Sequence, residues 1–332
     1  MTIAASILFD PAYLEAALLT AHELRGMDDV LHRVYLVLLE ASGPGSAKAN
    51  ADAAAIVHKF CIHFNGETEW FCAIKVQNTI APFSADHFSN AIVYKALLPS
   101  MLADEPYLLN IDAGLLPGDE FHAFVRELDA RYCQADGALE EGWVVGAHCV
   151  ENVDLIPHAL ALLPAHTLYP AGNVLLFHTA RYQRSLWSER FLAHYEILRT
   201  RLEYAEQELI CLTAQPHELL ALPGAARRTT PFLGLDVLLG EAAPLPESAT
   251  RDCLFFKFVG SFKPWKYWVL DPNKALYTRR RAALEQHFDL GKFSLVHDYR
   301  NQGGSDEFRL AFLEAYDRSL RAAAPPHEGS PC

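Results

Sequence analysis

The sequence predicts an α/β fold in which helices cover a mostly parallel sheet, and two observations favour it. Strand and helix patterns alternate along the first half of the chain, and the expected strands are continuous apolar runs. Alternating β and α elements build parallel sheets, whose strands are apolar on both faces because both are covered. Hydrophobic residues make up 51% of the 332 residues, so the chain can bury a large core without disulfides.

Each element of the first half follows from local signals. Ser6 to Phe9 is a short apolar run that Asp10-Pro11 ends. Residues 14–24 place Leu and Ala at helical spacing, and Gly26 closes that helix. The later strands and helices follow from the same two patterns. The expected strands are 34–39, 60–64, 70–76 and 107–112, and the expected helices are 47–59 and 89–101.

The second half is less regular. Apolar runs predict strands at 143–149, 173–177 and 254–259, and helical spacing predicts helices at 185–204, 274–288 and 306–322. Residues 212–240 are rich in Pro, Gly and small residues and predict loops with short strands. Three prolines in 323–332 predict a disordered tail.

Composition excludes several classes of function. The net charge of −13 makes nucleic acid a poor partner, because an acidic surface repels phosphate backbones. No run of eighteen apolar residues is present, and Met1 to Leu8 does not resemble a leader, so we expect a cytoplasmic protein. The seven cysteines form no CxxC pair and predict reduced, buried thiols, with zinc or disulfides as the alternative. His58, Cys61 and His63 are close in sequence, but ordinary strand positions explain them better than a metal site.

Topology alone places two acids at one edge of the sheet. Asp10 and Asp112 each follow an expected strand, and parallel sheets bind ligands at the carboxyl ends of their strands. The motifs GxxxxGK[ST], GxGxxG, HExxH and GxSxG are all absent.

A series of short motifs runs along residues 3–290, and their order is more specific than any one of them. The pieces are Phe9-Asp10-x-x-Tyr13, His87-Phe88-Ser89, Tyr94-Lys95, Tyr107-Leu108-Leu109-Asn110-Ile111-Asp112-Ala113-Gly114, Tyr169-Pro170-Ala171-Gly172-Asn173-Val174-Leu175-Leu176-Phe177, Glu206-Gln207-Glu208 and Gly260-Ser261-Phe262-Lys263-Pro264-Trp265. Together they resemble the family 8 retaining glycosyltransferases, which include lipopolysaccharide galactosyl- and glucosyltransferases and glycogenin. The resemblance implies a GT-A fold, a Rossmann-like, mostly parallel sheet flanked by helices, and a UDP-sugar donor.

The resemblance also implies roles for single residues. Asp10 and Tyr13 would hold the uracil, and Lys95 stands where the family has a donor-contacting arginine. Asp112 would be the first acid of the DxD metal motif. The plainer alternatives are a first-turn aromatic for Tyr13, a solvated helix lysine for Lys95 and a loop cap for Asp112.

The sequence departs from the family at the metal ligands. The second acid of DxD is Gly114, and the histidine expected three residues before GxxKPW is Lys257. A protonated lysine has no lone pair, so Mg²⁺ or Mn²⁺ would be poorly held and we expect no metal cofactor. We therefore predict a metal-independent site in which the Lys257 ammonium replaces the cation, with inactivation as the alternative. The family's asparagine is displaced by two positions to Asn173, which puts its sugar contact in doubt.

By the same resemblance, Gln207 would lie near the anomeric carbon and Glu206 would bind sugar hydroxyls; an exposed acidic turn is the alternative. The segment with Gly260, Lys263 and Trp265 would close over the diphosphate, or rest on an anionic membrane surface.

These inferences define one leading function. We expect a retaining hexosyltransferase that moves a hexose from a UDP-sugar to a glycan, lipid-linked or protein acceptor, with at most peripheral contact to the inner face of a membrane. Residues 1–150 would form the nucleotide-sugar-binding half, and 151–322 the acceptor-side half of the same domain. The alternative is a catalytically inactive GT-A-like protein that binds a nucleotide, a glycan or a partner enzyme.

Overall fold

The computed structural model describes residues 2–66, 68–81, 90–134, 142–150, 169–202, 206–223, 254–257 and 274–290. A seven-stranded sheet in the order β3-β2-β1-β4-β7-β6-β8 forms its centre. Its strands are β1 (Ile3–Phe9), β2 (Arg33–Leu39), β3 (Phe71–Val76), β4 (Tyr107–Ile111), β6 (Val145–Val150), β7 (Tyr169–His178) and β8 (Leu219–Ala221). Strands β3, β2, β1 and β4 are parallel, and β7 is antiparallel to both of its neighbours. The predicted α/β fold with a mostly parallel sheet is confirmed.

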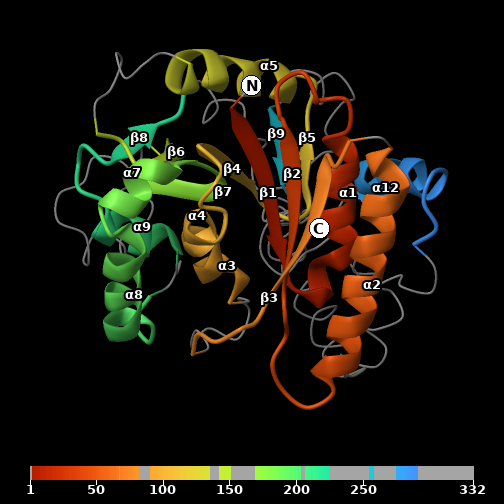
Figure 1. Cartoon of the computed structure of the whole chain (residues 1–332), viewed down its shortest axis with the longest axis horizontal. Coiled ribbons are helices and arrows are strands. Elements are labelled where there is room, and N and C mark those ends of the chain that lie inside the picture. The colour runs from red at the N-terminus through yellow and green to blue at the C-terminus, as the bar shows by residue number, and fades with distance from the viewer. Residues whose placement is uncertain are drawn as a thin grey trace, which may run out of the picture.

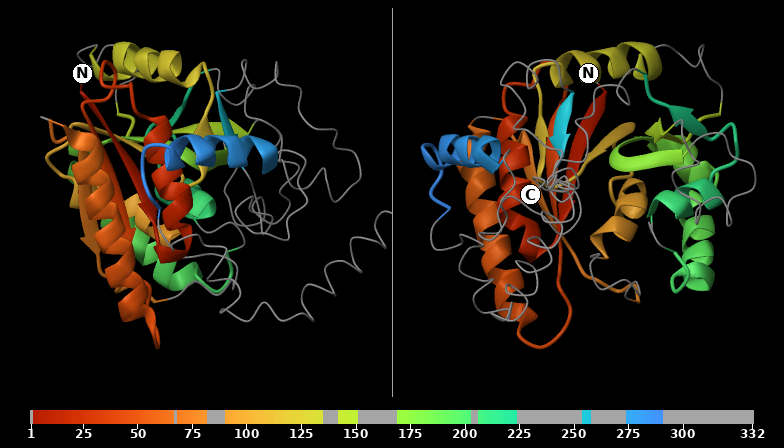
Figure 2. Two further views of the ribbon diagram at one scale, coloured as in Figure 1. Left: turned by 90° about the vertical axis from the view of Figure 1, so that its right-hand side faces the viewer. Right: turned by 180° about the vertical axis from the view of Figure 1, so that it is seen from behind.

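Helices cover both faces of this sheet, and each face has its own apolar core (Figures 1 and 2). On one face lie α1 (Leu14–Glu23), α2 (Ser46–Asn65) and α12 (Lys274–Glu285). On the other lie α3 (Ala91–Tyr94), α4 (Leu98–Met101), α7 (Thr179–Arg184), α8 (Trp187–Leu198) and α9 (Glu206–Thr213). Helix α5 (Phe121–Leu128) crosses the edge where β1 begins. None of the described helices is both long and apolar enough to cross a membrane.

One predicted strand, 60–64, is wrong, because these residues form the last turns of α2. The buried residues Ala53, Val57, Phe60 and Cys61 recur at helical spacing, and Ile62 is 65% exposed. A short apolar run fits either element, and here the longer period decides it. His58, Cys61 and His63 therefore lie on a helix and not on a strand.

The expected long helix over 185–204 is also wrong in its extent. Helix α7 ends at Arg184 and α8 begins at Trp187, because Leu186 between them has a positive φ of 51°. The apolar stripe of α8, which includes Trp187, Phe191 and Tyr195, is buried in the core. The expected helix 306–322 and the tail 323–332 lie outside the described residues.

A second, two-stranded sheet pairs β5 (Leu115–Pro117) with β9 (Phe255–Lys257). The strands are antiparallel, with Leu115 opposite Lys257. Because β5 starts three residues after Asp112, this register brings the end of β9 to the loop that follows β4.

Helix α12 is fastened to α1 by buried and half-buried ion pairs. The Tyr277 hydroxyl donates to Glu15 Oε1 at 3.0 Å, and Arg281 Nε lies 3.0 Å from the same oxygen. Arg280 pairs with Glu23 at 2.7 Å. The basic run at 279–281 therefore contributes two arginines to helix packing.

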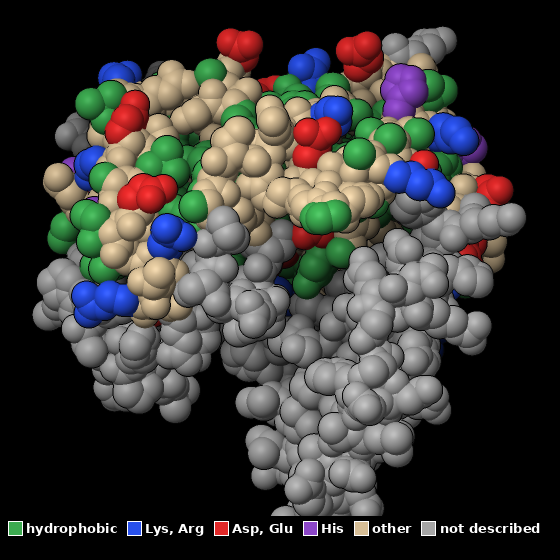
Figure 3. Space-filling view, turned by 90° about the horizontal axis from the view of Figure 1, so that it is seen from below, with side chains coloured by type: hydrophobic (Ala, Val, Ile, Leu, Met, Phe, Trp, Pro, Cys, Tyr) green, Lys and Arg blue, Asp and Glu red, His purple; other side chains and the backbone are tan. Residues whose placement is uncertain are grey.

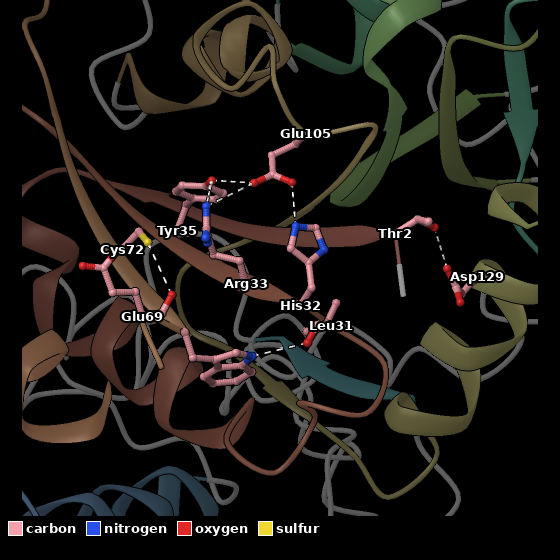
Figure 4. A network of polar contacts seen from close by, with 10 residues as sticks. Thr2, Leu31, His32, Arg33, Tyr35, Glu69, Cys72, Glu105 and Asp129 are labelled. Atoms are coloured by element: carbon pink, nitrogen blue, oxygen red, sulfur yellow. Dashed lines mark hydrogen bonds and ion pairs between the residues drawn. The ribbon is translucent and has the colours of Figure 1, made fainter. Parts of the chain in front are cut away.

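At the amino edge of the sheet, the buried carboxylate of Glu105 contacts residues at the start of β2 and in the turn before it (Figure 4). Tyr35 donates its hydroxyl to Glu105 Oε1 at 2.5 Å, and His32 Nε2 lies 2.7 Å from Oε2. Arg33 Nη1 donates to the Tyr35 hydroxyl at 3.3 Å. Burial, foremost, raises the pKa of Tyr35 to about 12, and the neighbouring Glu105 adds to the shift.

Candidate functional site

Several of the predicted site residues lie at the carboxyl edge of the parallel strands, which is the lower side of the sheet in Figure 1. Asp10 directly follows β1, and Asp112 follows the adjacent strand β4. Asp10 caps the short 3₁₀ helix Pro11–Tyr13, where its Oδ1 accepts from Ala12 N at 2.9 Å. Tyr13 packs half-buried against the core. Viewed from this side, the described surface carries acidic and basic side chains close to one another (Figure 3).

Lys95 is the centre of a buried charge cluster. It lies in the 3₁₀ turn Lys95–Leu97 and is only 6% exposed, so its interpretation as a solvated helix lysine is wrong. Its ammonium forms an ion pair with Asp112, and it lies 3.2 Å from Glu206 Oε1 and 3.3 Å from the Gly172 carbonyl oxygen. Burial opposes the charge, but the two carboxylates outweigh it and raise the pKa of Lys95. Lys95 is therefore a fixed cation that links β4 to α9.

Asp112 has a second ammonium on its other oxygen. Lys257 Nζ lies 2.5 Å from Asp112 Oδ2 and also donates to Asn173 Oδ1. Burial alone would raise the pKa of Asp112, but Lys257 and Lys95 lower it below its ordinary value. The sequence predicts the Lys257 ammonium in place of the divalent cation; the structure puts it beside Asp112, the acid of the DxD position, and its role stays a prediction. Asn173 faces this cluster despite its displaced position in the sequence.

The loop after Asp112 has a fixed conformation. Gly114 has a φ of +85°, which a residue with a side chain rarely adopts, and its N–H donates to Thr20 Oγ1 at 3.0 Å. The Thr20 hydroxyl also lies 2.9 Å from the Leu115 carbonyl oxygen. Thr20 was not among the predicted site residues; its sequence signal is a polar side chain on the buried stripe of α1.

The Glu206-Gln207-Glu208 motif forms the first turn of α9. Glu206 and Glu208 are both buried, so the interpretation as an exposed acidic turn is wrong. Gln207, between them, is half-buried. Helix α9 approaches β7 at Gly172, where an added Cβ would lie 2.4 Å from Glu206 Oε1. This close approach, which a glycine inside a strand can signal, was not predicted.

The residues present do not fit the divalent cation that the family resemblance implies. The ammonium of Lys257 fills the space beside Asp112, Gly114 offers no side chain, and Asn173 supplies a neutral oxygen. Within the described ranges, no group of three or more His, Cys, Asp or Glu could hold a metal ion. The predicted donor-binding residues Gly260, Lys263 and Trp265 lie outside the described part of the chain.

Solved glycosyltransferases share this fold. The structure of the galactosyltransferase LgtC in complex with donor and acceptor sugar analogs aligns with a TM-score of 0.56 at 15% identity, covering 85% of this chain and 96% of that one. The glycosyltransferase GlyE of Streptococcus pneumoniae TIGR4 gives 0.54 at 13% identity, covering 90% of this chain and 63% of that one. The bifunctional glycosyltransferase WbbM gives 0.55 at 10% identity, covering 85% and 50%. No protein-family model and no curated protein matches the sequence. The chain has the GT-A fold of glycosyltransferases, as predicted.

Proposed function

We propose that this protein is a retaining hexosyltransferase that uses a UDP-sugar and no divalent cation. The observation that carries the proposal is the position of Lys257 Nζ, 2.5 Å from Asp112 Oδ2. The family resemblance implies a dication on two carboxylates at this place, and such a unit has no net formal charge. The pair of Asp112 and Lys257 has no net formal charge either, so the electrostatic balance of the site is kept.

The ammonium stabilises the leaving diphosphate. As the bond between the anomeric carbon and the diphosphate oxygen breaks, negative charge grows on the phosphate. A cation about 4 Å from a phosphate oxygen contributes on the order of 4 kcal/mol at an effective dielectric constant near 20. Lys257 is 23% exposed, so a ligand can reach it. Lys263, from the GxxKPW segment, is the second cation of the proposal.

Retention proceeds by attack on the same face of the sugar. The acceptor hydroxyl forms the new bond to the anomeric carbon, and its proton passes to the leaving diphosphate, so no separate base is needed. In this arrangement Gln207 lies near the anomeric carbon and Glu206, held by Lys95, binds sugar hydroxyls. Asp10 and Tyr13 hold the uracil at the end of β1. A glycan, lipid-linked or protein acceptor, and a cytoplasmic location with at most peripheral membrane contact, complete the proposal.

The decisive experiment is release of UDP from UDP-glucose, UDP-galactose and their N-acetyl forms, with EDTA or with Mn²⁺. We expect release that EDTA does not change and that falls at least a hundredfold in K257A. Release only with Mn²⁺ would contradict the metal-free site. UDP binding by calorimetry without release, even with candidate acceptors, would instead support the non-catalytic GT-A-like protein. A second measurement addresses the mechanism: a covalent glycosyl-enzyme detected by mass spectrometry in Q207A or E206A would favour double displacement.

A further inference from the structure

The Lys257 ammonium lies between oxygens that come from two different strands. Asp112 follows β4, and Asn173 lies in β7, its antiparallel neighbour. The Asp112 N–H donates to the Asn173 carbonyl oxygen at 3.0 Å, so the sheet fixes the two backbones relative to each other. The side-chain oxygens of both residues accept from the same ammonium.

The loop after β4 has no second side-chain oxygen to offer, because Asp112 is followed by Ala113 and Gly114. Gly114 occupies the third position of the DxD motif, and its φ of +85° disfavours any residue with a Cβ. Its N–H is held by Thr20 on α1, which keeps the loop in this conformation. A second side-chain oxygen that contacts the cation must therefore come from a neighbouring element.

We propose that Asn173 is a positioning residue, whose amide oxygen holds the Lys257 ammonium against Asp112 so that the cation site is built across β4 and β7. The role of the ammonium toward the diphosphate rests on the proposed function. The placement of the ammonium between Asp112 and Asn173 does not depend on it. An ammonium has three N–H donors, and Asp112 and Asn173 accept two of them. Among the described residues no other hydrogen-bond acceptor of this ammonium is found, and we assign the third N–H to a phosphate oxygen.

The choice of an amide has a physical reason. A lysine head sits on a flexible four-carbon stem, and one ion pair does not fix its direction. A second carboxylate would fix it, but together with Asp112 it would outweigh the ammonium and give the site a net negative charge, which repels the diphosphate. A neutral oxygen fixes the direction and leaves the charge, which assigns Asn173 to Lys257 and not to the donor sugar.

A double-mutant cycle tests this assignment, with UDP as the calorimetric probe and UMP as the comparison. We expect N173A to weaken UDP binding about tenfold, since it removes a hydrogen bond to a charged group, and to change UMP binding much less. In the K257A background the same change should have no further effect, because Asn173 acts only through the ammonium. Equal losses in both backgrounds would overturn the proposal. N65A is the matched control: Asn65 bonds Phe71 through both amide atoms, at 2.6 and 2.8 Å, at the start of β3 on the opposite, amino edge of the sheet.

A second experiment tests the built site without any nucleotide. An imidazole at position 257 ends short of the ammonium by roughly the length of a metal–nitrogen bond, about 2 Å. The double variant N173D/K257H should therefore bind Mn²⁺, measured by electron paramagnetic resonance of the free ion. K257H alone should bind it at least tenfold more weakly, and N173D alone, which keeps the ammonium, should not bind it.

The two experiments separate the two ideas. Mn²⁺ binding in N173D/K257H no tighter than in K257H would overturn the assignment of Asn173, whatever UDP does. A wild-type protein that does not bind UDP would overturn the proposed function, while a gained Mn²⁺ site would still support the cation site across β4 and β7.

Discussion

The two edges of the central sheet bury carboxylates in different ways. At the amino edge, Glu105 accepts from the Tyr35 hydroxyl at 2.5 Å and lies 2.7 Å from His32 Nε2, with Arg33 at 3.9 Å. These partners belong to one strand and the turn before it. At the carboxyl edge, Asp112 and Glu206 are held by ammonium groups.

This difference indicates that the contacts of Glu105 at the amino edge are structural, whereas the charge cluster at the carboxyl edge is a functional site. A single carboxylate with a hydroxyl and an imidazole is satisfied locally, and it links the turn before β4 to the start of β2, on the two sides of β1. Burying several full charges is costly, and a protein that has apolar residues of similar volume in their place is often at least as stable. The carboxyl edge nevertheless collects charges from four distant parts of the chain, at the edge where parallel sheets bind ligands. This contrast favours function over stability as the reason for the cluster.

The largest effect should come from removing the buried ammonium that two carboxylates share. K95M leaves Glu206 without the ammonium and Asp112 with Lys257 alone, and breaking a buried pair costs about 3–5 kcal/mol of unfolding free energy. Urea denaturation at pH 7 measures it. The control is K75M, because Lys75 is mostly exposed and pairs with Glu40 at 2.8 Å, which predicts a loss within about 1 kcal/mol. Similar losses in K95M and K75M would remove the contrast between the cluster and an ordinary surface pair.

The cluster should also give the chain a specific acid sensitivity. The pKa of Asp112 is lowered from 3.8, so the stability that its ionisation contributes is present above that pH and is lost as the pH falls through the lower folded value. The stability difference between wild type and D112N should therefore be constant from about pH 5 to 8 and shrink below about pH 4. Denaturation curves at pH 7, 4 and 3 check it. A difference that grows on acidification would mean that the pKa of Asp112 is raised.

The contacts of Glu105 at the amino edge should contribute to stability and not to UDP binding. E105Q weakens the hydrogen bonds of Tyr35 and His32 and should cost about 2 kcal/mol of unfolding free energy. UDP affinity, measured by calorimetry on the folded variant, should not change, whereas K257A should lower it. A loss of UDP affinity in E105Q would show that the two edges are coupled through the sheet.

The sequence predicted the fold for a physical reason. Continuous apolar runs indicate strands that are buried on both faces, so they predict the parallel sheet. Asp10 and Asp112 directly follow two of these strands, so the topology predicts that they lie at its carboxyl edge. The motif positions put Lys257 at the place of a metal ligand, and its contact with Asp112 comes from the structure. Local patterns could not decide whether residues 60–64 form a strand or a helix, because a short apolar segment fits both the strand period and the helix period.

The rest of the site depends on packing that no local pattern encodes. The burial of Lys95 and Glu206 follows from the docking of α9 on β7, and sequence alone favoured solvated alternatives almost as strongly. Comparison of Asn173 with the family motif concerned only a contact with the sugar, which the displaced position put in doubt. The contact of Asn173 with Lys257 depends on the pairing of β5 with β9, which joins segments about 140 residues apart.

The smallest effect should come from a single methyl group at the approach of α9 to β7. In G172A the new Cβ would lie 2.4 Å from Glu206 Oε1, so Glu206 must move and its contact with Lys95 must lengthen. We expect a stability loss of about 1 kcal/mol. Because Glu206 is proposed to bind sugar hydroxyls, the KM for the UDP-sugar should rise severalfold while the affinity for UDP stays the same. G146A is the matched control, since its Cβ would meet the Leu222 Cδ2 methyl at 2.8 Å and no polar group. If both variants raise KM equally, the close approach at Gly172 serves packing only, and the carboxyl edge differs from the amino edge in charge but not in its contact with the sugar.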